Sequence, residues 1–215
     1  TNKNGKMYAD TLFDVYNHLS PDEVFPYAPP QGLEALRDLW QDKMLKENPD
    51  LSKETITRPI VTNALTHGLS LIADLFVESG DTVLVPTHNW GNYKLIYETR
   101  HSANIETYSI FNQEGHYTTN DLVTTLENFN QDKVILILNY PNNPTGYTPN
   151  NDEVTTIVSA VRSLAEKGTK VIAVVDDAYY GLFYEDVYRQ SIFTALNQIE
   201  SSNILPIRLD GATKE

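Results

Sequence analysis

The sequence predicts an α/β fold in which helices cover both faces of a mostly parallel sheet. Near-continuous apolar runs of strand length, at residues 134–138 and 171–175, are typical of strands buried on both faces. Segments with the apolar spacing of helices separate these runs, an alternation typical of parallel sheets with helical crossovers. A chain of 215 residues is long enough for one such domain with a substantial core.

Residues 1–50 are predicted to form a helical segment that leads into this domain. Four features are expected there: an amphipathic helix over 7–19, a helix start at Ser20-Pro21-Asp22-Glu23, a proline-rich extended loop over 25–31 and a helix over 33–47. The helix start follows from Ser20 as N-cap, Pro21 at the first helical position and Glu23 at the third.

Residues 51–215 are predicted to be the main domain, in which strands alternate with helices. The expected strands cover residues 58–62, 82–86, 104–111, 133–139, 170–176 and 205–209. The expected helices cover residues 66–78, 92–100, 120–129, 152–167 and 192–199. Each helix is recognised by apolar residues at helical spacing, such as Leu69, Ile72, Ala73 and Phe76 in the first of them.

Composition excludes several classes of function. The formal net charge of −13 argues against binding to nucleic acid or to an anionic membrane surface, since both need a basic face. The chain has no cysteine, and its five histidines show no ligand spacing, so no metal site is expected. Its apolar runs are too short to cross a membrane, and residues 1–6 lack the apolar core of a signal peptide. A cytoplasmic location is therefore expected.

The residues that follow the strands suggest a binding site. In open parallel sheets, ligands bind beyond the carboxyl ends of the strands. Five strand ends are followed by polar or aromatic segments: Asn63–His67, Thr87–Tyr93, Tyr140–Gly146, Asp176–Gly181 and Asp210–Lys214. The first segment opens a helix, whose N-terminal N–H groups attract anions. The other four offer an aromatic face, an amide, a carboxylate with a phenol, and a lysine.

This set of groups suits pyridoxal 5'-phosphate. A Schiff base with the cofactor aldehyde needs a lysine. The cofactor withdraws electrons efficiently only while its ring nitrogen is protonated, which a buried carboxylate favours.

The motifs resemble those of class I/II aminotransferases, pyridoxal-phosphate-dependent enzymes of the aspartate aminotransferase fold (fold type I). Asn142–Gly146 is similar to the family's Asn-Pro-Thr-Gly motif, and Asp176–Tyr179 is similar to its Asp-x-x-Tyr motif. Trp90-Gly91-Asn92 resembles the segment that stacks on the cofactor ring, and Tyr27–Leu33 resembles a loop that reaches the neighbouring subunit. Lys214 falls where the family's Schiff-base lysine belongs.

The resemblance implies a set of site residues in this chain. Lys214 is the catalytic lysine, Asp176 pairs with the pyridine nitrogen, and Asn143 and Tyr179 bind the O3′ oxygen. Trp90 stacks on the ring, while Ala64, Leu65 and Thr66 open the helix that binds the phosphate. Tyr27 reaches the phosphate of a partner subunit, which implies a homodimer that acts on an amino acid and a 2-oxo acid.

The chain also departs from the family pattern. Ala64 stands where the family usually has glycine, and Gly211 stands where it often has serine or threonine. The family's phosphate-binding arginine, its substrate-carboxylate arginine and its C-terminal small domain fall beyond residue 215. The resemblance therefore implies a chain truncated after the Schiff-base lysine, with an incomplete large domain over 51–215. Residues 1–215 alone are expected to have no turnover.

Structural interpretations compete with the functional ones at several positions. Asn143 is also a turn residue, Asp176 a possible helix cap, Trp90 a core residue and Lys214 a surface lysine near a chain end. Tyrosines such as Tyr27 are common in proline-rich loops and at interfaces, and Asp177 is expected to be structural. Two other functions stay open: a fold type I lyase or decarboxylase, and a non-catalytic regulatory domain that binds the cofactor.

Overall fold

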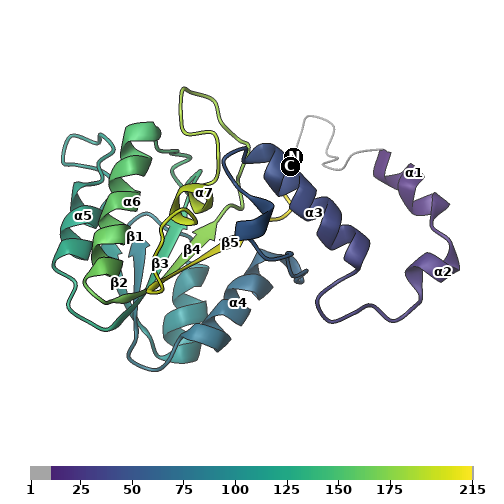
Figure 1. Cartoon of the computed structure of the whole chain (residues 1–215), viewed down its shortest axis with the longest axis horizontal. Coiled ribbons are helices and arrows are strands. Elements are labelled where there is room, and N and C mark those ends of the chain that lie inside the picture. Colours follow the sequence, from purple (N-terminus) through teal and green to yellow (C-terminus); the bar gives the residue numbers. More distant parts are fainter. Residues whose placement is uncertain (1–10, 215) are drawn as a thin grey trace.

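The computed structural model describes residues 11–214, without the side chain of Phe13, and has an α/β fold. Five parallel strands form one sheet in the order β2-β1-β3-β4-β5 (Figure 1). The strands are β1 (Thr82–Pro86), β2 (Asn104–Tyr108), β3 (Lys133–Asn139), β4 (Lys170–Asp176) and β5 (Ile204–Leu209). The predicted fold class, a mostly parallel sheet flanked by helices, is confirmed.

The helices lie near the positions predicted from apolar spacing. They are α1 (Thr11–His18), α2 (Pro21–Val24), α3 (Glu34–Glu47), η1 (Lys53–Thr55), α4 (Ala64–Phe76), η2 (Lys94–Thr99), α5 (Asn120–Glu127), α6 (Asn151–Glu166) and α7 (Ile192–Leu196). The η2 segment is a stretch of π-helix inside the helix predicted over 92–100. At α2 the predicted helix start is confirmed, since the Ser20 backbone N–H donates to Glu23 Oε2 at 2.9 Å.

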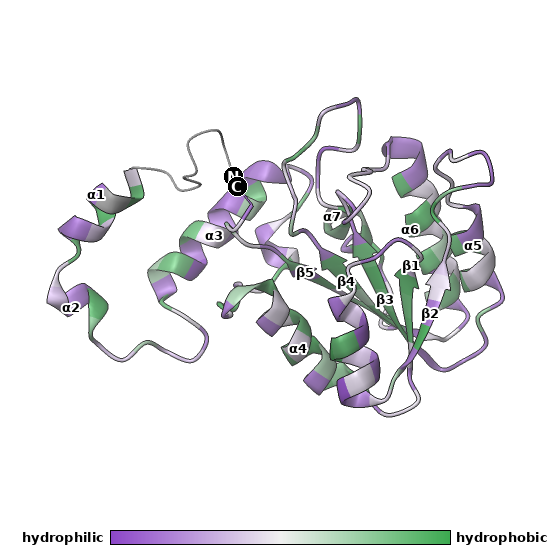
Figure 2. Cartoon of the chain, turned by 180° about the vertical axis from the view of Figure 1, so that it is seen from behind, coloured by the Kyte–Doolittle hydropathy of each residue, from purple (hydrophilic) through white to green (hydrophobic). Residues whose placement is uncertain are grey.

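Side chains alternate between the two faces of the sheet and form two cores. In β3, Val134, Leu136 and Leu138 pack beneath α5, α6 and α7, whereas Ile135 and Ile137 pack against α4 and η2. All five side chains are fully buried. The central strands β1, β3 and β4 are mostly hydrophobic and lie inside the domain (Figure 2). The two covered faces explain why β3 and β4 are apolar throughout instead of alternating with polar residues.

The strand order places a natural binding crevice at the carboxyl edge of the sheet. From β1 the chain first adds β2 on one side and then β3, β4 and β5 on the other. The direction of winding therefore reverses between β1 and β3, and the connections there leave the sheet on opposite faces. Ligands of open α/β sheets bind at such reversal points.

The strand predicted over residues 58–62 is wrong, because this segment has no strand partner in the structure. Pro59 has no N–H to donate to a ladder. Its carbonyl accepts from Arg37 Nε at 2.6 Å, and the Val61 N–H donates to the carbonyl of Gln31 at 3.0 Å. The segment is thus held by α3 and the loop before it. Similarly, β2 ends at Tyr108, and Phe111 instead forms an isolated bridge with Tyr117.

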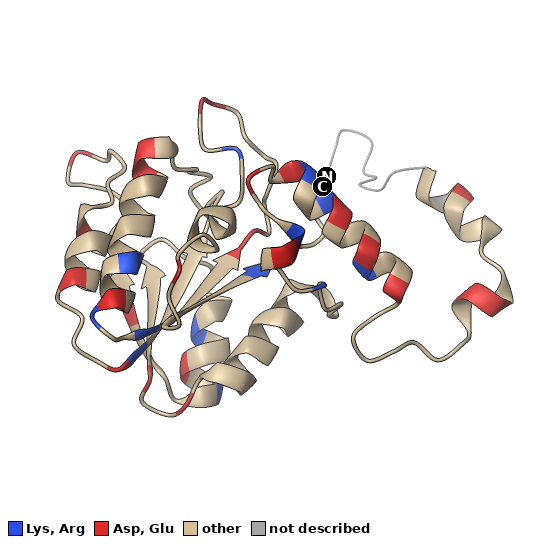
Figure 3. Ribbon diagram, viewed as in Figure 1, with Lys and Arg blue, Asp and Glu red and all other residues tan. Residues whose placement is uncertain are grey.

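The segment before α3 lies apart from the sheet (Figure 1). The helix predicted over 7–19 is described only from Thr11, and residues 7–10 lie outside the described part. Large apolar side chains of α1 and at the end of α2 are exposed, including Tyr16 and Phe25. Acidic residues are spread over the helices and loops of the molecule (Figure 3). Within residues 11–214, every helix is too short or too polar to cross a bilayer.

Candidate functional site

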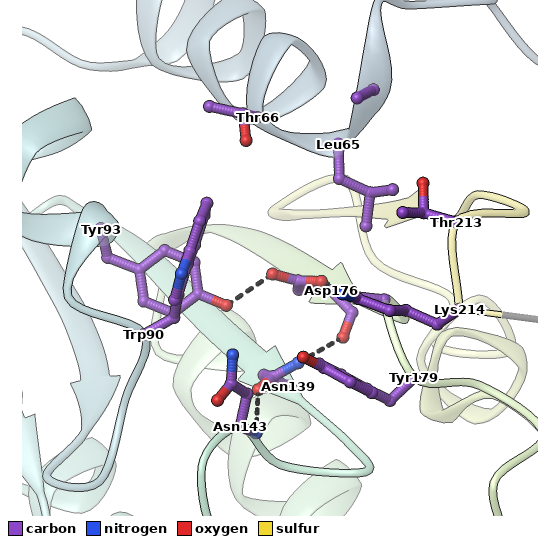
Figure 4. A pocket seen from close by; sticks show the side chains of 12 residues that line it. Leu65, Thr66, Trp90, Tyr93, Asn139, Asn143, Asp176, Tyr179, Thr213 and Lys214 are labelled. Carbon is purple, nitrogen blue, oxygen red and sulfur yellow. Dashed lines mark hydrogen bonds between the residues drawn. The ribbon is translucent and has the colours of Figure 1, made fainter. Parts of the chain in front are cut away.

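A cavity of about 190 Å³ opens at the carboxyl edge of the sheet (Figure 4). Every residue predicted for the site except Tyr27 contributes to its wall. The lining residues are Ala64, Leu65, Thr66, Trp90, Tyr93, Asn139, Asn143, Asp176, Ala178, Tyr179, Thr213 and Lys214. They come from α4 and from the segments that follow β1, β3, β4 and β5. The cavity therefore lies at the reversal point of the sheet.

Asp176 is the buried carboxylate of this cavity. It ends β4 and is only 4% exposed. The Tyr93 hydroxyl donates to Oδ2 at 2.6 Å, and the Ala178 N–H donates to Oδ1 at 3.1 Å. Burial raises the pKa of Asp176 above its usual value, and these two hydrogen bonds oppose the rise. A cationic donor in the cavity would stabilise the ionised carboxylate further.

Two asparagines connect the ends of β3 and β4. Asn139, the last residue of β3, donates through Nδ2 to the carbonyl of Asp176 at 2.8 Å. Its Oδ1 accepts from the Asn143 N–H at 2.7 Å. Asn143 follows in the loop and lies at the cavity wall (Figure 4). The network ties the Asp176 carbonyl to the loop that carries Asn143, and this loop places Asn143 at the cavity wall.

The N-terminus of α4 forms the wall of the cavity opposite Asn139 and Asn143 (Figure 4). This helix of 13 residues has no acidic residue in its first turn, so its positive dipole end is not compensated. Ala64 begins the helix with φ of 67°, a left-handed conformation that costs an alanine about 1 kcal/mol. This conformation explains why glycine suits the position. The same wall carries the hydroxyl of Thr66, and Thr213 lies beside Leu65 (Figure 4).

Lys214 extends into the cavity beside Asp176 and Tyr179 (Figure 4). Its Nζ lies 5.5 Å from the centroid of the Tyr179 ring. Trp90 stands across the cavity and contacts Tyr93 edge to face, with ring centroids 5.7 Å apart. An amine, a carboxylate, an aromatic face and a helix N-terminus thus surround one space. This arrangement can hold a phosphorylated aromatic ring that carries a carbonyl group.

Tyr27 does not belong to this cavity. Its side chain is 85% exposed, in the loop between α2 and α3. The prediction that Tyr27 reaches a partner subunit stays a prediction. At Gly211, where the family often has serine or threonine, an added Cβ would lie 2.6 Å from Leu65 Cδ1. The Leu65 side chain occupies the space that a larger residue at position 211 would need.

Four lining residues were not predicted from the sequence: Tyr93, Asn139, Ala178 and Thr213. Two of them had a recognisable signal. Tyr93 lies three residues after Trp90, a spacing that places both on one side of a helical turn. Asn139 ends an otherwise apolar buried strand, a position where a polar side chain needs a partner.

We expect Tyr93→Phe to lower the free energy of unfolding at pH 7 by about 1.5–3 kcal/mol, the usual contribution of a hydrogen bond to a charged group. Tyr97 provides a matched control, because it lies one turn later, is equally buried, and its hydroxyl has no hydrogen-bond partner within residues 11–214. Tyr97→Phe should leave stability unchanged or raise it slightly. Denaturant unfolding of both variants measures the difference. Equal losses in the two variants would contradict the assignment of the Tyr93 contact.

Comparison with known proteins places the chain among enzymes. A profile of the family described as "Aminotransferase class I and II" matches residues 8–205. The chain is 34% identical over 135 residues to a histidinol-phosphate aminotransferase of Ruminiclostridium cellulolyticum, covering 63% of this chain and 34% of that protein. It is 27% identical over 164 residues to a probable aspartate aminotransferase of Methanocaldococcus jannaschii, covering 74% and 39%.

Solved structures show the same fold. An aminotransferase from Anaerococcus prevotii superimposes with a TM-score of 0.80 at 19% identity, covering 94% of this chain and 49% of that chain. A tyrosine aminotransferase from Leishmania infantum superimposes with a TM-score of 0.71 at 16% identity, covering 94% and 51%. The chain therefore spans about half the length of these structures, and 34% to 43% of the first curated relatives.

Proposed function

The chain belongs to the class I and II aminotransferase family, and from this premise we propose that its cavity is a seat for pyridoxal 5'-phosphate. The protein would transfer an amino group between an amino acid and a 2-oxo acid. One observation carries the proposal. A buried carboxylate, that of Asp176, and a lysine amine, that of Lys214, face the same cavity at the N-terminus of a helix.

The residues present fit the cofactor. Burial raises the pKa of Asp176. A protonated ring nitrogen beside the carboxylate would oppose this rise, because an adjacent positive charge stabilises the ionised form. The uncompensated N-terminus of α4, through Ala64, Leu65 and Thr66, would bind the phosphate. Asn143 and Tyr179 would bind the O3′ oxygen, and Trp90 would pack on the ring. The hydroxyl of Thr213 is a further donor at the phosphate end of the cavity.

The bound cofactor supplies an aldehyde for the amine and a ring that accepts the electron pair released at the substrate's Cα. The chain's own groups would direct this chemistry. Lys214 Nζ would hold the cofactor through its aldehyde carbon, with loss of water, until the substrate amine displaces it, and the freed lysine amine would carry the Cα proton as general base and acid. Asp176 would keep the ring nitrogen protonated. Tyr93 and the Ala178 N–H would keep Asp176 ionised for that purpose.

The wider assembly is also part of the proposal. Residues 51–215 would be the cofactor-binding domain, and residues 1–50 would lead into it. A homodimer, in which Tyr27 reaches the partner's phosphate, would explain the exposed apolar side chains near Tyr27. We also propose a cytoplasmic location, as expected from the sequence. The names of the relatives divide among several substrates, so the substrate is left at the level of an amino acid and a 2-oxo acid.

The reaction can be tested by its products. The protein, in the longest form that its gene encodes, is loaded with pyridoxal phosphate and mixed with one amino acid at a time. An aminotransferase should convert the cofactor to its aminated form and release one 2-oxo acid per amino group, as measured by mass spectrometry. Lys214→Ala should lower the rate by at least about a thousandfold, since the base and the anchoring amine are both lost.

The alternatives give different products. A decarboxylase would release carbon dioxide, and an eliminating lyase would release ammonia. A regulatory domain would bind the cofactor and leave the amino acid unchanged. Release of carbon dioxide or ammonia in place of the 2-oxo acid would contradict the proposed transfer.

A further inference from the structure

Three charged side chains are buried together next to the cavity but outside its wall. Asp177 follows the end of β4, Arg208 lies in β5, and Asp210 follows β5. Their side chains are 1%, 2% and 4% exposed. None of the three lines the cavity, so the proposed chemistry gives them no direct contact with a bound group.

The guanidinium of Arg208 joins the two carboxylates. Its Nε lies 2.5 Å from Asp177 Oδ2, and its Nη2 lies 3.1 Å from Asp210 Oδ2. Its Cζ lies 4.7 Å from the ring centroid of Tyr180, whose hydroxyl donates to the carbonyls of Glu47 and Arg189. Arg208 is therefore held on one side by a fixed ring and on its edges by two carboxylates.

The two carboxylates follow the ends of different strands, β4 for Asp177 and β5 for Asp210. Asp177 directly follows Asp176, and its N–H donates to the carbonyl of Leu209 at 2.9 Å. Asp210 accepts from the Gly211 N–H at 2.8 Å, in the loop that ends at Lys214. A rigid link between the carboxylates is thus also a link between the two strand ends that carry Asp176 and Lys214.

Stability alone does not account for such a cluster. Burying ions costs several kcal/mol each, and apolar residues of similar volume often stabilise a protein at least as well. Arg208 Nη1 and Nη2 and Asp210 Oδ2 make no well-aligned hydrogen bond to the part of the chain that the structure describes. Burial also raises the pKa of Asp177 to about 6 in spite of the nearby guanidinium. A cluster kept at this cost is best explained by the geometry that it imposes.

We propose that Arg208 is a positioning residue, whose ion pairs with Asp177 and Asp210 set the place of the Lys214 amine relative to the Asp176 carboxylate. The inference rests on the proposed function, because it concerns the lysine that would hold the cofactor. The planar fork of arginine can pair with two carboxylates at once in a fixed geometry, whereas lysine offers a single compact charge. A positive charge at position 208 without the arginine fork should therefore not hold the Lys214 amine in place.

Selective labelling tests the position of Lys214. The protein is mixed with pyridoxal phosphate and then with borohydride, and peptide mapping gives the ratio of label on Lys214 to label on the exposed Lys170. Arg208→Lys keeps the charge, and the triple variant Asp177→Leu, Arg208→Met, Asp210→Asn removes all three charges of the cluster and should keep or raise stability. Arg100→Lys is the matched control, in an exposed pair with Asp74.

Both Arg208 variants should lower the labelling ratio about tenfold, since small displacements strongly reduce the reactivity of positioned groups. Arg100→Lys should stay within about twofold of the wild type. The triple variant separates position from stability, because a purely structural cluster would leave labelling intact in a protein that is equally stable. If the triple variant does not fold, the labelling ratio of Arg208→Lys alone tests the inference. A ratio within about twofold of the wild type in either folded variant would overturn the inference.

Hydrogen exchange separates this inference from the proposed function. If the wild-type protein shows no preference for Lys214, the proposed function fails. The hydrogen exchange of backbone amides 211–214 in the cofactor-free protein then tests whether Arg208 holds this loop in place. Arg208→Lys should speed that exchange about tenfold relative to Arg100→Lys, because the loop loses its tie to β4. Unchanged exchange would overturn the role of Arg208.

Discussion

Asp176→Asn is expected to weaken the binding of pyridoxal phosphate by at least about a hundredfold. Asn keeps the size of the side chain and can still accept from the Tyr93 hydroxyl, but it carries no charge. A charge-assisted hydrogen bond in a site shielded from water contributes several kcal/mol, and each 1.4 kcal/mol corresponds to about a tenfold change in affinity. Spectroscopic titration with the cofactor measures the dissociation constant.

Asp74→Asn is the control for this change. Asp74 also lies in an ion pair, with Arg100, but its side chain is 40% exposed and lies on α4 away from the cavity wall. Its loss should leave the dissociation constant within about twofold of the wild-type value. A dissociation constant for Asp176→Asn that matches this control would mean that Asp176 does not meet the ring nitrogen.

Asp177→Ala should destabilise the protein by about 3–5 kcal/mol, because removal of one partner leaves the other charge buried without sufficient compensation. The Arg208 side chain is 2% exposed and cannot reach water to replace the lost carboxylate. A large loss of stability is therefore expected although Asp177 does not line the cavity. Denaturant unfolding at pH 7 measures the change in the free energy of unfolding.

Two comparisons make this prediction specific. Asp74→Ala, which breaks an exposed pair, should cost no more than about 1 kcal/mol. The triple variant Asp177→Leu, Arg208→Met, Asp210→Asn should recover most of the loss, since no charge of the cluster then remains buried alone. A cost at Asp177 as small as that at Asp74 would show that Arg208 finds adequate partners without it.

The strands and the carboxyl-edge site were predictable because their signals are local. The apolar runs of β3 and β4 fixed both strands to the residue, since only strands covered on both faces need such runs. The position of Asp176, Asn143 and Trp90 after strands then brought them to one edge of the sheet. The prediction for residues 58–62 was wrong because a short segment containing Ile60 and Val61 was assigned as a strand without regard to Pro59, which cannot donate to a ladder.

The supporting contacts depend on tertiary structure and were less visible. Arg208 lies in a strand whose sequence gives no hint that its guanidinium is buried between Asp177 and Asp210. The left-handed conformation of Ala64 is also unexpected, because alanine rarely adopts a positive φ. Such features arise where distant segments meet, and local sequence patterns do not report them. They concentrate at the candidate site, where local preference is most often overridden.

The most direct test of the account is the identity of the lysine that binds pyridoxal phosphate. The protein is incubated with the cofactor, reduced with borohydride, digested and mapped by mass spectrometry. We expect one cofactor per chain, on Lys214, because its amine faces the cavity that also holds Asp176. Lys94 and Lys170 are exposed and lie outside the cavity wall, so they should carry only background label. Stoichiometric label on either of them, with Lys214 unmodified, would contradict the assignment of the site.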